Sequence, residues 1–316
     1  MGITTRDLAP DDAETLAALM LRIEADHPTG FCLGAVEILE IMRDKPDAVF
    51  EGAFDGDRLV ACTTVIPGLA QQSGQRFTLF GDVDPDRLGE GIGTLMLTRS
   101  VDRARAIHAE TAPDVPARYA ASALEGRDDQ AALLTAAGFE AGRHSFLMVA
   151  DLGQPIPTPA LADGVSVTGF DAEWAEELRL AHNAAFADYP DGTPMSADFW
   201  AMFMVRSAHS RHHLSAVARD GEGSVVAYVF AHEYAVPPSG GAGPEVHVPF
   251  VGTLPAHRGR GLATALLARV LRLARDAGYS TASLNVDTHN PTGALGVYER
   301  AGFRPVHRQD FYRLDE

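Results

Sequence analysis

Cysteine is scarce in this sequence. Its 316 residues contain two cysteines, Cys32 and Cys62, and both lie in the first half of the chain. Two isolated cysteines are more often buried small residues in a reducing compartment than partners in a disulfide. We therefore expect free thiols and a cytoplasmic protein.

Long apolar runs and an excess of positive charge are also missing. No apolar run is long enough to span a bilayer, and no signal-peptide pattern opens the chain, so we expect no membrane association. Lys and Arg number 26 against 43 Asp and Glu, which gives a formal net charge of −17. This balance argues against nucleic acid as a partner and suits a cationic substrate, although an acidic surface also favours solubility.

Arginine and glycine are concentrated in one stretch, HRGRGLATALLARVL at 257–271. Its leucines recur at helical spacing, and the preceding EVHVPFVG is rich in strand-forming residues. A glycine loop between a strand and a helix presents unpaired first-turn N–H groups and the positive end of the helix dipole. With Arg258, Gly259, Arg260 and Gly261 in place, the loop is predicted to bind an anion, typically a phosphate.

Two common phosphate-binding loops do not fit these residues. The loop lacks the lysine followed by Ser or Thr of a Walker motif and the three-glycine pattern of a Rossmann fold. The remaining pattern, Arg258-x-x-Gly261-x-Ala263, resembles the pyrophosphate loop of the GNAT acetyltransferase superfamily. NPTGALGVYERAGF (290–303) resembles the second cofactor motif of that family. The resemblance covers most of residues 164–316 and implies acetyl-CoA as cofactor.

The chain also resembles itself. DPDRLGEGIGTLML (84–97) matches LPAHRGRGLATALL (254–267), and AAGFE (136–140) matches RAGFR (300–304) in the same order. A proline-rich stretch without periodicity separates the copies. We therefore expect an α/β (α+β) protein with two tandem GNAT domains, residues 1–150 and 164–316, joined by a linker at 151–163. The resemblance implies a mixed, centrally splayed β-sheet flanked by helices in each domain.

The two copies differ where the chemistry is expected. Leu88 and Glu90 of the first copy align with Arg258 and Arg260, and Leu134 stands where the second copy has a tyrosine. A neutral and an anionic side chain in place of two cations weaken a pyrophosphate site. We therefore expect a degenerate first domain that buttresses a catalytic second domain.

Acetyl transfer to an amine needs a proton acceptor, hydrogen-bond donors for the thioester oxygen and a proton for the departing thiolate. Strand alternation before the loop places Glu245, His247, Pro249, Val251 and Thr253 on one predicted face. His247 stands where many family members carry a glutamate base, and an imidazole with a pKa near ~6.5 is largely neutral at cytoplasmic pH. We predict His247 as the base, with Glu245 in reserve; a purely structural histidine is the alternative.

The resemblance assigns the remaining roles. Pro249 cannot donate to a sheet ladder, so the strand is expected to splay there and to free backbone groups for the acetyl carbonyl and pantetheine. Tyr298, whose phenol stays protonated at neutral pH, is expected to protonate the thiolate. Asn290 is expected to cap the helix of Tyr298 and touch pantetheine. The predicted cofactor-binding residues are Val251, Gly252, Thr253, Arg258, Gly259, Arg260, Gly261, Leu262, Ala263, Thr264 and Asn290.

Two weaker patterns complete the candidates. The histidines of AHSRHH (208–213) lack a flanking Cys or carboxylate pattern, so we expect no metal site. FADYPDG (186–192) follows the first helix of the second domain, where this family usually shapes its acceptor site. Asp188, Tyr189 and Asp191 could contact a cationic amine there, and a plain polar turn is the alternative.

The resemblance to the GNAT family therefore implies an acetyl-CoA-dependent N-acetyltransferase that acts by direct attack of a primary amine of a small molecule, and the acidic composition suits a cationic one; we expect a monomer or homodimer. The acceptor stays open between the cysteinyl amine of a pseudodisaccharide thiol precursor and an amino-sugar or peptide antibiotic. A non-catalytic acyl-CoA-binding protein is the alternative from another class.

Overall fold

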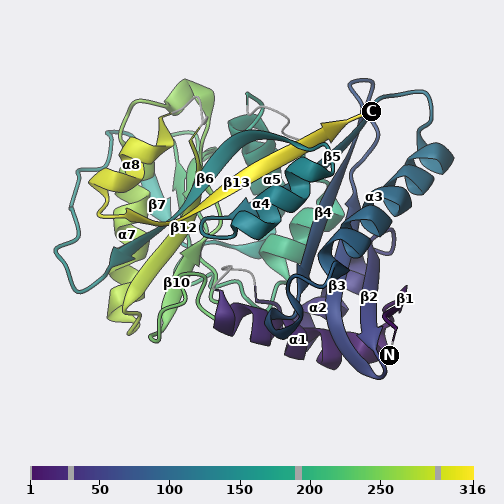
Figure 1. The fold of residues 1–316 in the computed structure, drawn as a ribbon. Coiled ribbons are helices and arrows are strands. Elements are labelled where there is room, and N and C mark those ends of the chain that lie inside the picture. Colours follow the sequence, from purple (N-terminus) through teal and green to yellow (C-terminus); the bar gives the residue numbers. More distant parts are fainter. Residues whose placement is uncertain (1, 28–31, 189–193, 289–292) are drawn as a thin grey trace. The chain divides into compact units, whose positions relative to one another are not determined.

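The computed structural model describes residues 2–27, 32–188, 194–288 and 293–316 and divides into two compact units (Figure 1). Unit 1 consists of Met1–His144 and Arg308–Glu316, and unit 2 consists of Ser145–His307. Both units are mixed α/β structures, as the sequence predicts.

A mixed sheet forms the framework of unit 1. Its strands lie in the order β1 (Thr4–Asp7), β2 (Val49–Asp55), β3 (Arg58–Pro67), β4 (Gln75–Val83), β5 (Ala117–Leu124) and β13 (Arg304–Asp315). Neighbouring strands are antiparallel except β4 and β5, which run parallel from the Gln75–Ala117 pair to the Thr78–Ala120 pair. Beyond that register the two parallel strands are no longer paired, so the sheet is splayed there.

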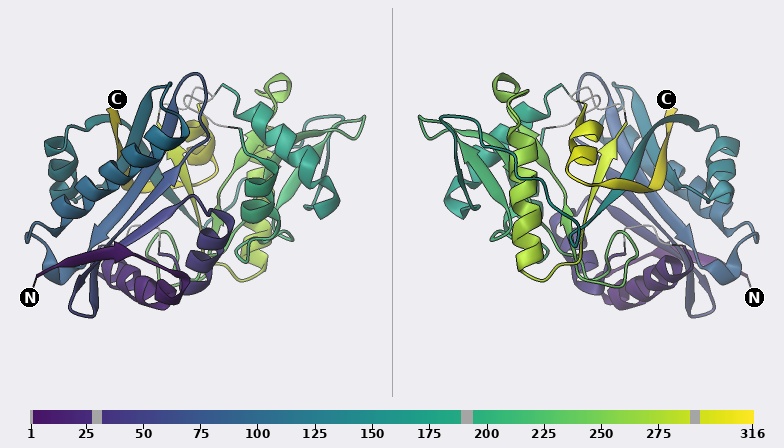
Figure 2. Two further views of the ribbon diagram at one scale, coloured as in Figure 1. Left: turned by 90° about the vertical axis from the view of Figure 1, so that its right-hand side faces the viewer. Right: turned by 90° about the vertical axis from the view of Figure 1, so that its left-hand side faces the viewer.

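Helices cover both faces of this sheet. Cys62 of β3 packs in one core with α1 (Ala13–Asp26) and α2 (Ala35–Asp44), whereas the neighbouring Ala61 packs with α3 (Ile92–Thr111). Because successive strand residues point to opposite faces, α1 and α3 lie on opposite sides of the sheet (Figure 2). Helix α4 (Asp128–Ala136) follows β5 and contacts it.

Unit 2 contains two strand ladders. One has the order β6 (Glu140–Asp151), β12 (Thr281–Asp287) and β10 (Glu245–Val248), with β12 and β10 parallel. The other is antiparallel, with the order β11 (Val251–Thr253), β9 (Val225–Val229), β8 (Ala216–Arg219) and β7 (Ser166–Thr168). The parallel pair ends at Val248, and two residues separate it from the start of β11, so this sheet is splayed at the corresponding place.

The helix predicted from the 262–271 pattern is confirmed as α7 (Leu262–Asp276). Its apolar positions, including Leu266, Leu267 and Val270, are buried in the core of unit 2. The opposite side of the sheet carries α5 (Ala175–Ala185), the short α6 (Ala197–Trp200) and a π-helical turn at Ala201–Val205, which share a second core with Tyr228 and Phe230. Helix α8 (Ala294–Arg300) contacts α7 and β12.

The last strand of each sequence half belongs to the other half's unit. β6 pairs with β12 of unit 2 through Ser145–Asp151, although it follows α4 of unit 1. β13 pairs with β5 of unit 1 through Gln309–Asp315, although it follows α8 of unit 2. The units therefore differ at these strands from the predicted ranges 1–150 and 164–316, because backbone pairing carries each strand across the boundary of its half.

The predicted linker lies against unit 2. Residues 152–165 contain no helix or strand, and Ile156 and Leu161 pack on the core of unit 2.

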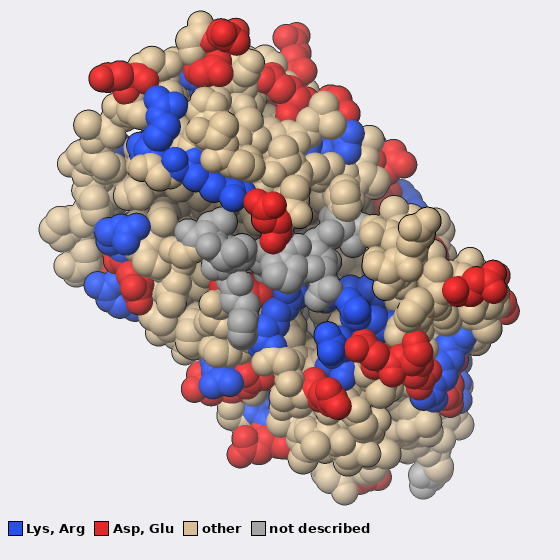
Figure 3. Space-filling view, turned by 90° about the horizontal axis from the view of Figure 1, so that it is seen from above, with Lys and Arg blue, Asp and Glu red and all other residues tan. Residues whose placement is uncertain are grey.

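Acidic and basic side chains lie beside one another on the face shown in Figure 3. No described helix is long and apolar enough to cross a membrane.

Candidate active site

The glycine–arginine loop of unit 2 joins β11 to α7. A single turn of 3₁₀ helix at Pro255–His257 follows the strand, and then Gly259 and Gly261 both adopt φ of 75°. A Cβ atom would meet nothing within 4 Å at either position, so glycine is favoured there by its left-handed backbone conformation. Gly261 provides no side-chain cap for α7, so the N–H groups of Leu262, Ala263 and Thr264 form its uncapped first turn.

The strand before this loop, β11, pairs with β9 and has backbone groups that face away from it. Phe230 N–H donates to Phe250 (3.1 Å) and Leu254 N–H donates to Val226 (3.0 Å), so alternate residues of this segment pair with β9. In an antiparallel ladder the intervening residues direct N–H and C=O to the opposite side, and these residues are Val251 and Thr253. On that side β12 is paired with β10 only up to Val248. The backbone groups of Val251 and Thr253 therefore face the gap that opens where the two parallel strands separate.

The predicted alternation of side chains along this strand is wrong beyond His247. Val246, Val248 and Val251 all pack with the α7 core, whereas Phe250 packs with the α5 core. The backbone leaves the strand at Pro249 and Phe250, and this irregularity shifts the side-chain phase by one residue. Val251 therefore does not share the face of His247, and Phe250 does.

His247 is buried on the α5 side of the sheet. Its Nδ1 lies 2.9 Å from the hydroxyl of Ser283, its register partner on β12, and its ring lies 5.6 Å from that of Tyr234. Burial lowers the pKa of His247 to about 4, well below the histidine value assumed from the sequence. The imidazole is therefore neutral at pH 7, which a proton acceptor requires.

Glu245, the reserve base, is held by its neighbours. Its carboxylate accepts hydrogen bonds from the Ser239 hydroxyl and from the Thr281 hydroxyl (3.3 Å), and its side chain is buried. These bonds fix the turn before β10 to β12. The carboxylate of Glu245 thus already accepts hydrogen bonds from two hydroxyl groups.

Tyr298 lies on α8 in the same core as α7. It is 9% exposed, and its ring makes an edge contact with Phe303, 6.3 Å away. Burial raises the pKa of Tyr298 to about 12, so the phenol carries its proton at neutral pH. A protonated phenol is the state that a proton donor needs.

The two arginines of the loop contact protein groups. Arg258 donates to the backbone oxygen of Ala185 at the end of α5 (2.9 Å) and pairs with Asp188 (3.2 Å). Arg260 donates to the backbone oxygen of Asp163 (3.2 Å) and lies 3.1 Å from His257. Arg258 therefore ties the loop to α5, a contact that the sequence pattern does not reveal.

Three predicted residues, Asn290, Tyr189 and Asp191, lie outside the described residues. Asp188 is described, and its carboxylate pairs with Arg258. Within the described ranges, no group of three or more His, Cys, Asp or Glu is arranged to hold a metal ion. His212 of the AHSRHH stretch instead approaches the backbone oxygen of Met204 (2.8 Å).

Sequence reasoning missed two buried histidines beside this site. His232 pairs with His247 through both backbone hydrogen bonds, 2.7 and 2.8 Å. His182 of α5 lies 2.6 Å from the hydroxyl of Tyr228. Neither is near the loop in sequence, and a lone histidine in an apolar segment gives no functional signal.

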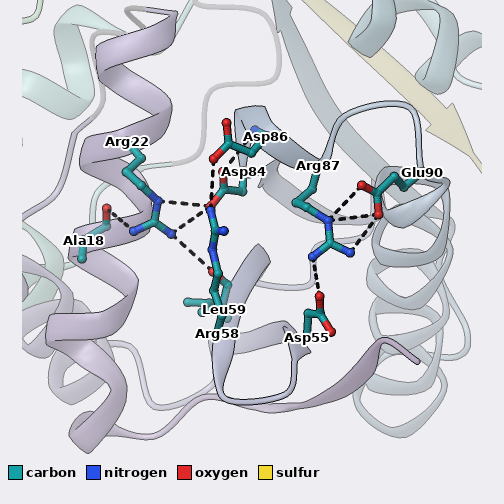
Figure 4. Close-up of polar contacts among 9 residues, drawn as sticks. All are labelled: Ala18, Arg22, Asp55, Arg58, Leu59, Asp84, Asp86, Arg87 and Glu90. Carbon is teal, nitrogen blue, oxygen red and sulfur yellow. Dashed lines mark hydrogen bonds and ion pairs between the residues drawn. The ribbon is translucent and has the colours of Figure 1, made fainter. Parts of the chain in front are cut away.

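The corresponding loop of unit 1 has the same backbone conformation but lacks the two arginines. Gly89 and Gly91 adopt φ of 78° and 80°, close to their counterparts in unit 2. Glu90 binds Arg87 (2.8 Å), which also pairs with Asp55 (2.8 Å) (Figure 4). Arg87 of this loop segment is therefore already paired with two carboxylates.

A second set of ion pairs holds the same loop of unit 1 from the other end. Asp84 is 1% exposed and accepts from both Arg22 of α1 (3.1 Å) and Arg58 of β3 (2.9 Å) (Figure 4). A cavity of about 370 Å³ lies beside this loop where β4 and β5 diverge, with Asp82 and Arg127 in its wall. Unit 1 thus retains a cavity at the position of the splay. The charged side chains of its loop, however, form ion pairs with other residues of unit 1.

Comparisons with known proteins agree with this architecture. Residues 172–303 match the acetyltransferase (GNAT) family. A mycothiol acetyltransferase of Frankia alni is 32% identical over 72% of this chain and 67% of its own length. One of Thermobispora bispora is 28% identical over 95% of both chains. Two further relatives of the same name are matched over 63% and 55% of their lengths.

A solved structure of similar fold also has the tandem arrangement. A tandem GNAT protein from the clavulanic acid biosynthesis pathway superposes with a TM-score of 0.76 at 17% identity, covering 99% of this chain and 98% of that one. At this identity the likeness concerns the fold. With the splayed sheet, the glycine loop and these relatives in agreement, the chain belongs to the GNAT acetyltransferase family.

Proposed function

We propose that unit 2 transfers the acetyl group of acetyl-CoA to a primary amine of a small molecule by direct attack. The observation that carries this proposal is the combination of backbone groups of Val251 and Thr253 that point away from β9, a glycine loop with two left-handed residues, and a buried neutral imidazole at His247. Acetyl-CoA would supply an activated acyl thioester.

The cofactor would be held by main-chain groups and two cations. Leu262, Ala263 and Thr264 offer first-turn N–H groups to a diphosphate, with Gly259 and Gly261 allowing close approach. Arg258 and Arg260 would add charge-assisted contacts, and Asn290 a contact to pantetheine. Val251, Gly252 and Thr253 would lie along the pantetheine and the acyl carbonyl.

Two side chains would handle protons. His247 would accept a proton from the attacking nitrogen, which becomes much more acidic as it gains positive charge in the attack. Tyr298 would donate its proton to the departing sulfur. Glu245 is the reserve acceptor, although its bonds to Ser239 and Thr281 favour a structural role.

The names of the relatives favour one acceptor, the mycothiol precursor with its cysteinyl amine. An amino-sugar or peptide antibiotic is the second candidate. A panel of amines containing both classes, read by thiol release from acetyl-CoA, tests the proposal. Binding of acetyl-CoA without thiol release for any amine would support the non-catalytic alternative.

Charge reversal in the loop should weaken cofactor binding. Arg258→Glu combined with Arg260→Glu should raise the Kd for acetyl-CoA at least tenfold, because charge-assisted hydrogen bonds contribute roughly 1.5–3 kcal/mol each. Isothermal calorimetry measures this. The matched control is the double variant Arg269→Glu with Arg275→Glu, which changes two exposed arginines of α7, the helix that follows the loop. Equal Kd values for both double variants would remove the loop from the binding site.

Only one tight site is expected in the whole chain. The loop of unit 1 has Leu88 and Glu90 in place of Arg258 and Arg260, and Glu90 pairs with Arg87, so calorimetry should give about one acetyl-CoA per chain. Gly261→Val should abolish that site, since a β-branched residue does not tolerate a φ of 75°. Gly91→Val, its counterpart in unit 1, should leave the stoichiometry unchanged. Two equal sites would place cofactor in unit 1 as well.

A further inference from the structure

A buried hydrogen bond joins α5 to the strand that carries the proposed thioester site. The Tyr228 hydroxyl lies 2.6 Å from Nδ1 of His182, and both side chains are at most 5% exposed. The rings of Phe186, Phe250 and Trp200 surround His182 at 4.7, 4.8 and 5.3 Å. A polar pair placed in an aromatic core lowers stability unless its hydrogen bond is well made, so it calls for a reason beyond packing.

Tyr228 lies directly against Gly252. The two residues are register partners in the β9–β11 ladder. A Cβ atom on Gly252 would stand 2.4 Å from the phenol ring and 2.6 Å from its oxygen, so only glycine fits beside this ring. Gly252 in turn lies between Val251 and Thr253, whose backbone groups face the splay.

Helix α5 therefore holds both ends of the segment from β11 to the loop. His182 binds the Tyr228 ring that packs on Gly252, and Ala185, one turn later, accepts from Arg258. A helix is stiff over one turn, so these two contacts fix the strand and the loop relative to each other.

The duplicated unit provides an internal comparison. Counting back from Gly91 and Gly261, Asp82 holds the place of Gly252, and its register partner is Cys62 in place of Tyr228. Counting from the first residues of α1 and α5, Met20 holds the place of His182. The unit whose loop has lost its cations thus also lacks the tyrosine, the histidine and the glycine.

We propose that Tyr228, held by His182, is a positioning residue for acetyl transfer: it fixes the Gly252 peptide and so aims the backbone groups of Val251 and Thr253 at the thioester. This inference rests on the proposed function, in which those groups bind the acyl carbonyl. An oxygen held by preorganised donors gains most when the donors do not need to move.

The protonation of the pair follows from burial. Burial raises the pKa of Tyr228 well above its ordinary value and lowers the pKa of His182 to about 4. The phenol therefore donates, the neutral Nδ1 accepts, and the other ring nitrogen of His182 carries the hydrogen. An asparagine could replace this acceptor, whereas a leucine could not.

The first test is Tyr228→Phe, which keeps the ring against Gly252 and removes the hydroxyl. We expect kcat to fall about tenfold, as for loss of one buried hydrogen bond, with the Kd for acetyl-CoA and the KM for the amine within about twofold of wild type. The carbonyl ¹³C shift of bound [1-¹³C]acetyl-CoA should also move, because it reports hydrogen bonding to that oxygen. His182→Leu should reproduce both changes, and His182→Asn should restore most of kcat and of the shift.

Tyr119→Phe is the matched control. Tyr119 is a buried tyrosine of unit 1 whose hydroxyl donates to Glu316 (3.2 Å), so the same atom is removed elsewhere. It should leave kcat and the ¹³C shift unchanged. Wild-type kcat and shift in Tyr228→Phe, or equal losses in Tyr119→Phe, would overturn the positioning role.

The two proposals fail differently. Thiol release by the wild-type protein with the amine panel tests acetyl transfer without any variant. If the wild type binds acetyl-CoA and releases no thiol, transfer is refuted, and the ¹³C shift difference between wild type and Tyr228→Phe still decides whether the pair positions the strand.

Discussion

Replacing His247 with alanine should lower kcat/KM for the amine by about 10²–10⁴-fold, the range for loss of a general base. The proposed role requires a neutral imidazole close to the attacking nitrogen, and burial keeps His247 neutral down to about pH 4, its own pKa. Affinity for acetyl-CoA should change little, because His247 lies on the α5 side of the sheet. Steady-state kinetics with calorimetry on the same samples measures both quantities.

Two further replacements of His247 test whether activity depends on a side chain that can accept a proton or only on one that can form the same hydrogen bond. His247→Gln can still hydrogen-bond to Ser283 but cannot accept a proton, so it should be nearly as slow as the alanine variant. His247→Glu should retain much of the activity, because a carboxylate can also accept a proton from the attacking nitrogen.

The pH dependence gives an independent reading. With the pKa of His247 at about 4, the rising limb at neutral and alkaline pH should follow the pKa of the acceptor amine, and it should shift between amines of different basicity. A wild-type rate in His247→Gln would exclude this residue as the base, and Glu245→Gln would then be the next variant.

Acidification should unfold unit 2 before unit 1. Burial lowers the pKa values of His182 and His247 to about 4, and burial together with neighbouring positive charge lowers that of His232 to about 3. An exposed histidine in the unfolded chain has a pKa near ~6.5, so the unfolded state binds these protons first as the pH falls. Stability is therefore fully present above pH ~6.5 and is lost towards pH 4, by about 5 kcal/mol between pH 7 and 5 for three such groups.

Unit 1 contains a group of the opposite sign. Burial raises the pKa of Asp82 to about 6, so the folded state binds this proton first and unit 1 gains stability as the pH falls below that value. Both tryptophans of the chain, Trp174 and Trp200, lie in unit 2. Urea unfolding followed by tryptophan fluorescence at pH 7 and 5 therefore reports the unit with the buried histidines.

The variant His182→Asn provides the control for this prediction. It removes one of the three titrating groups while keeping an acceptor for Tyr228, so the loss of stability between pH 7 and 5 should shrink by about a third. If the urea concentration at half-unfolding, measured by tryptophan fluorescence, is the same at pH 7 and 5, these histidines are already protonated in the folded unit and the prediction is wrong.

Much of this architecture is predictable because it depends on local signals. The helix at 262–276 follows from leucine spacing, and the loop before it follows from two glycines that only a left-handed backbone explains. The duplication follows from matching the chain with itself. The loop and the helix both lie within residues 257–276, and the duplication needs only the sequence for comparison.

The features that the sequence does not reveal depend on distant residues. The side-chain phase after His247 shifts at Pro249 and Phe250, and no periodicity indicates which way an irregular strand resumes. The His182–Tyr228 pair joins residues 46 positions apart. Similarly, Arg258 looks like a free cation in sequence, and only the fold brings the end of α5 beside it.

The crossed terminal strands have a consequence for synthesis on the ribosome. Residues 309–315, which complete the edge of β5, are made after residues 145–307, so the earlier strands of unit 1 have one unpaired edge until then. An unpaired edge attracts other strands. Release of a chain truncated after β12 would leave that edge permanently open, and synthesis of residues 309–315 thus decides whether the first-made half is protected against aggregation.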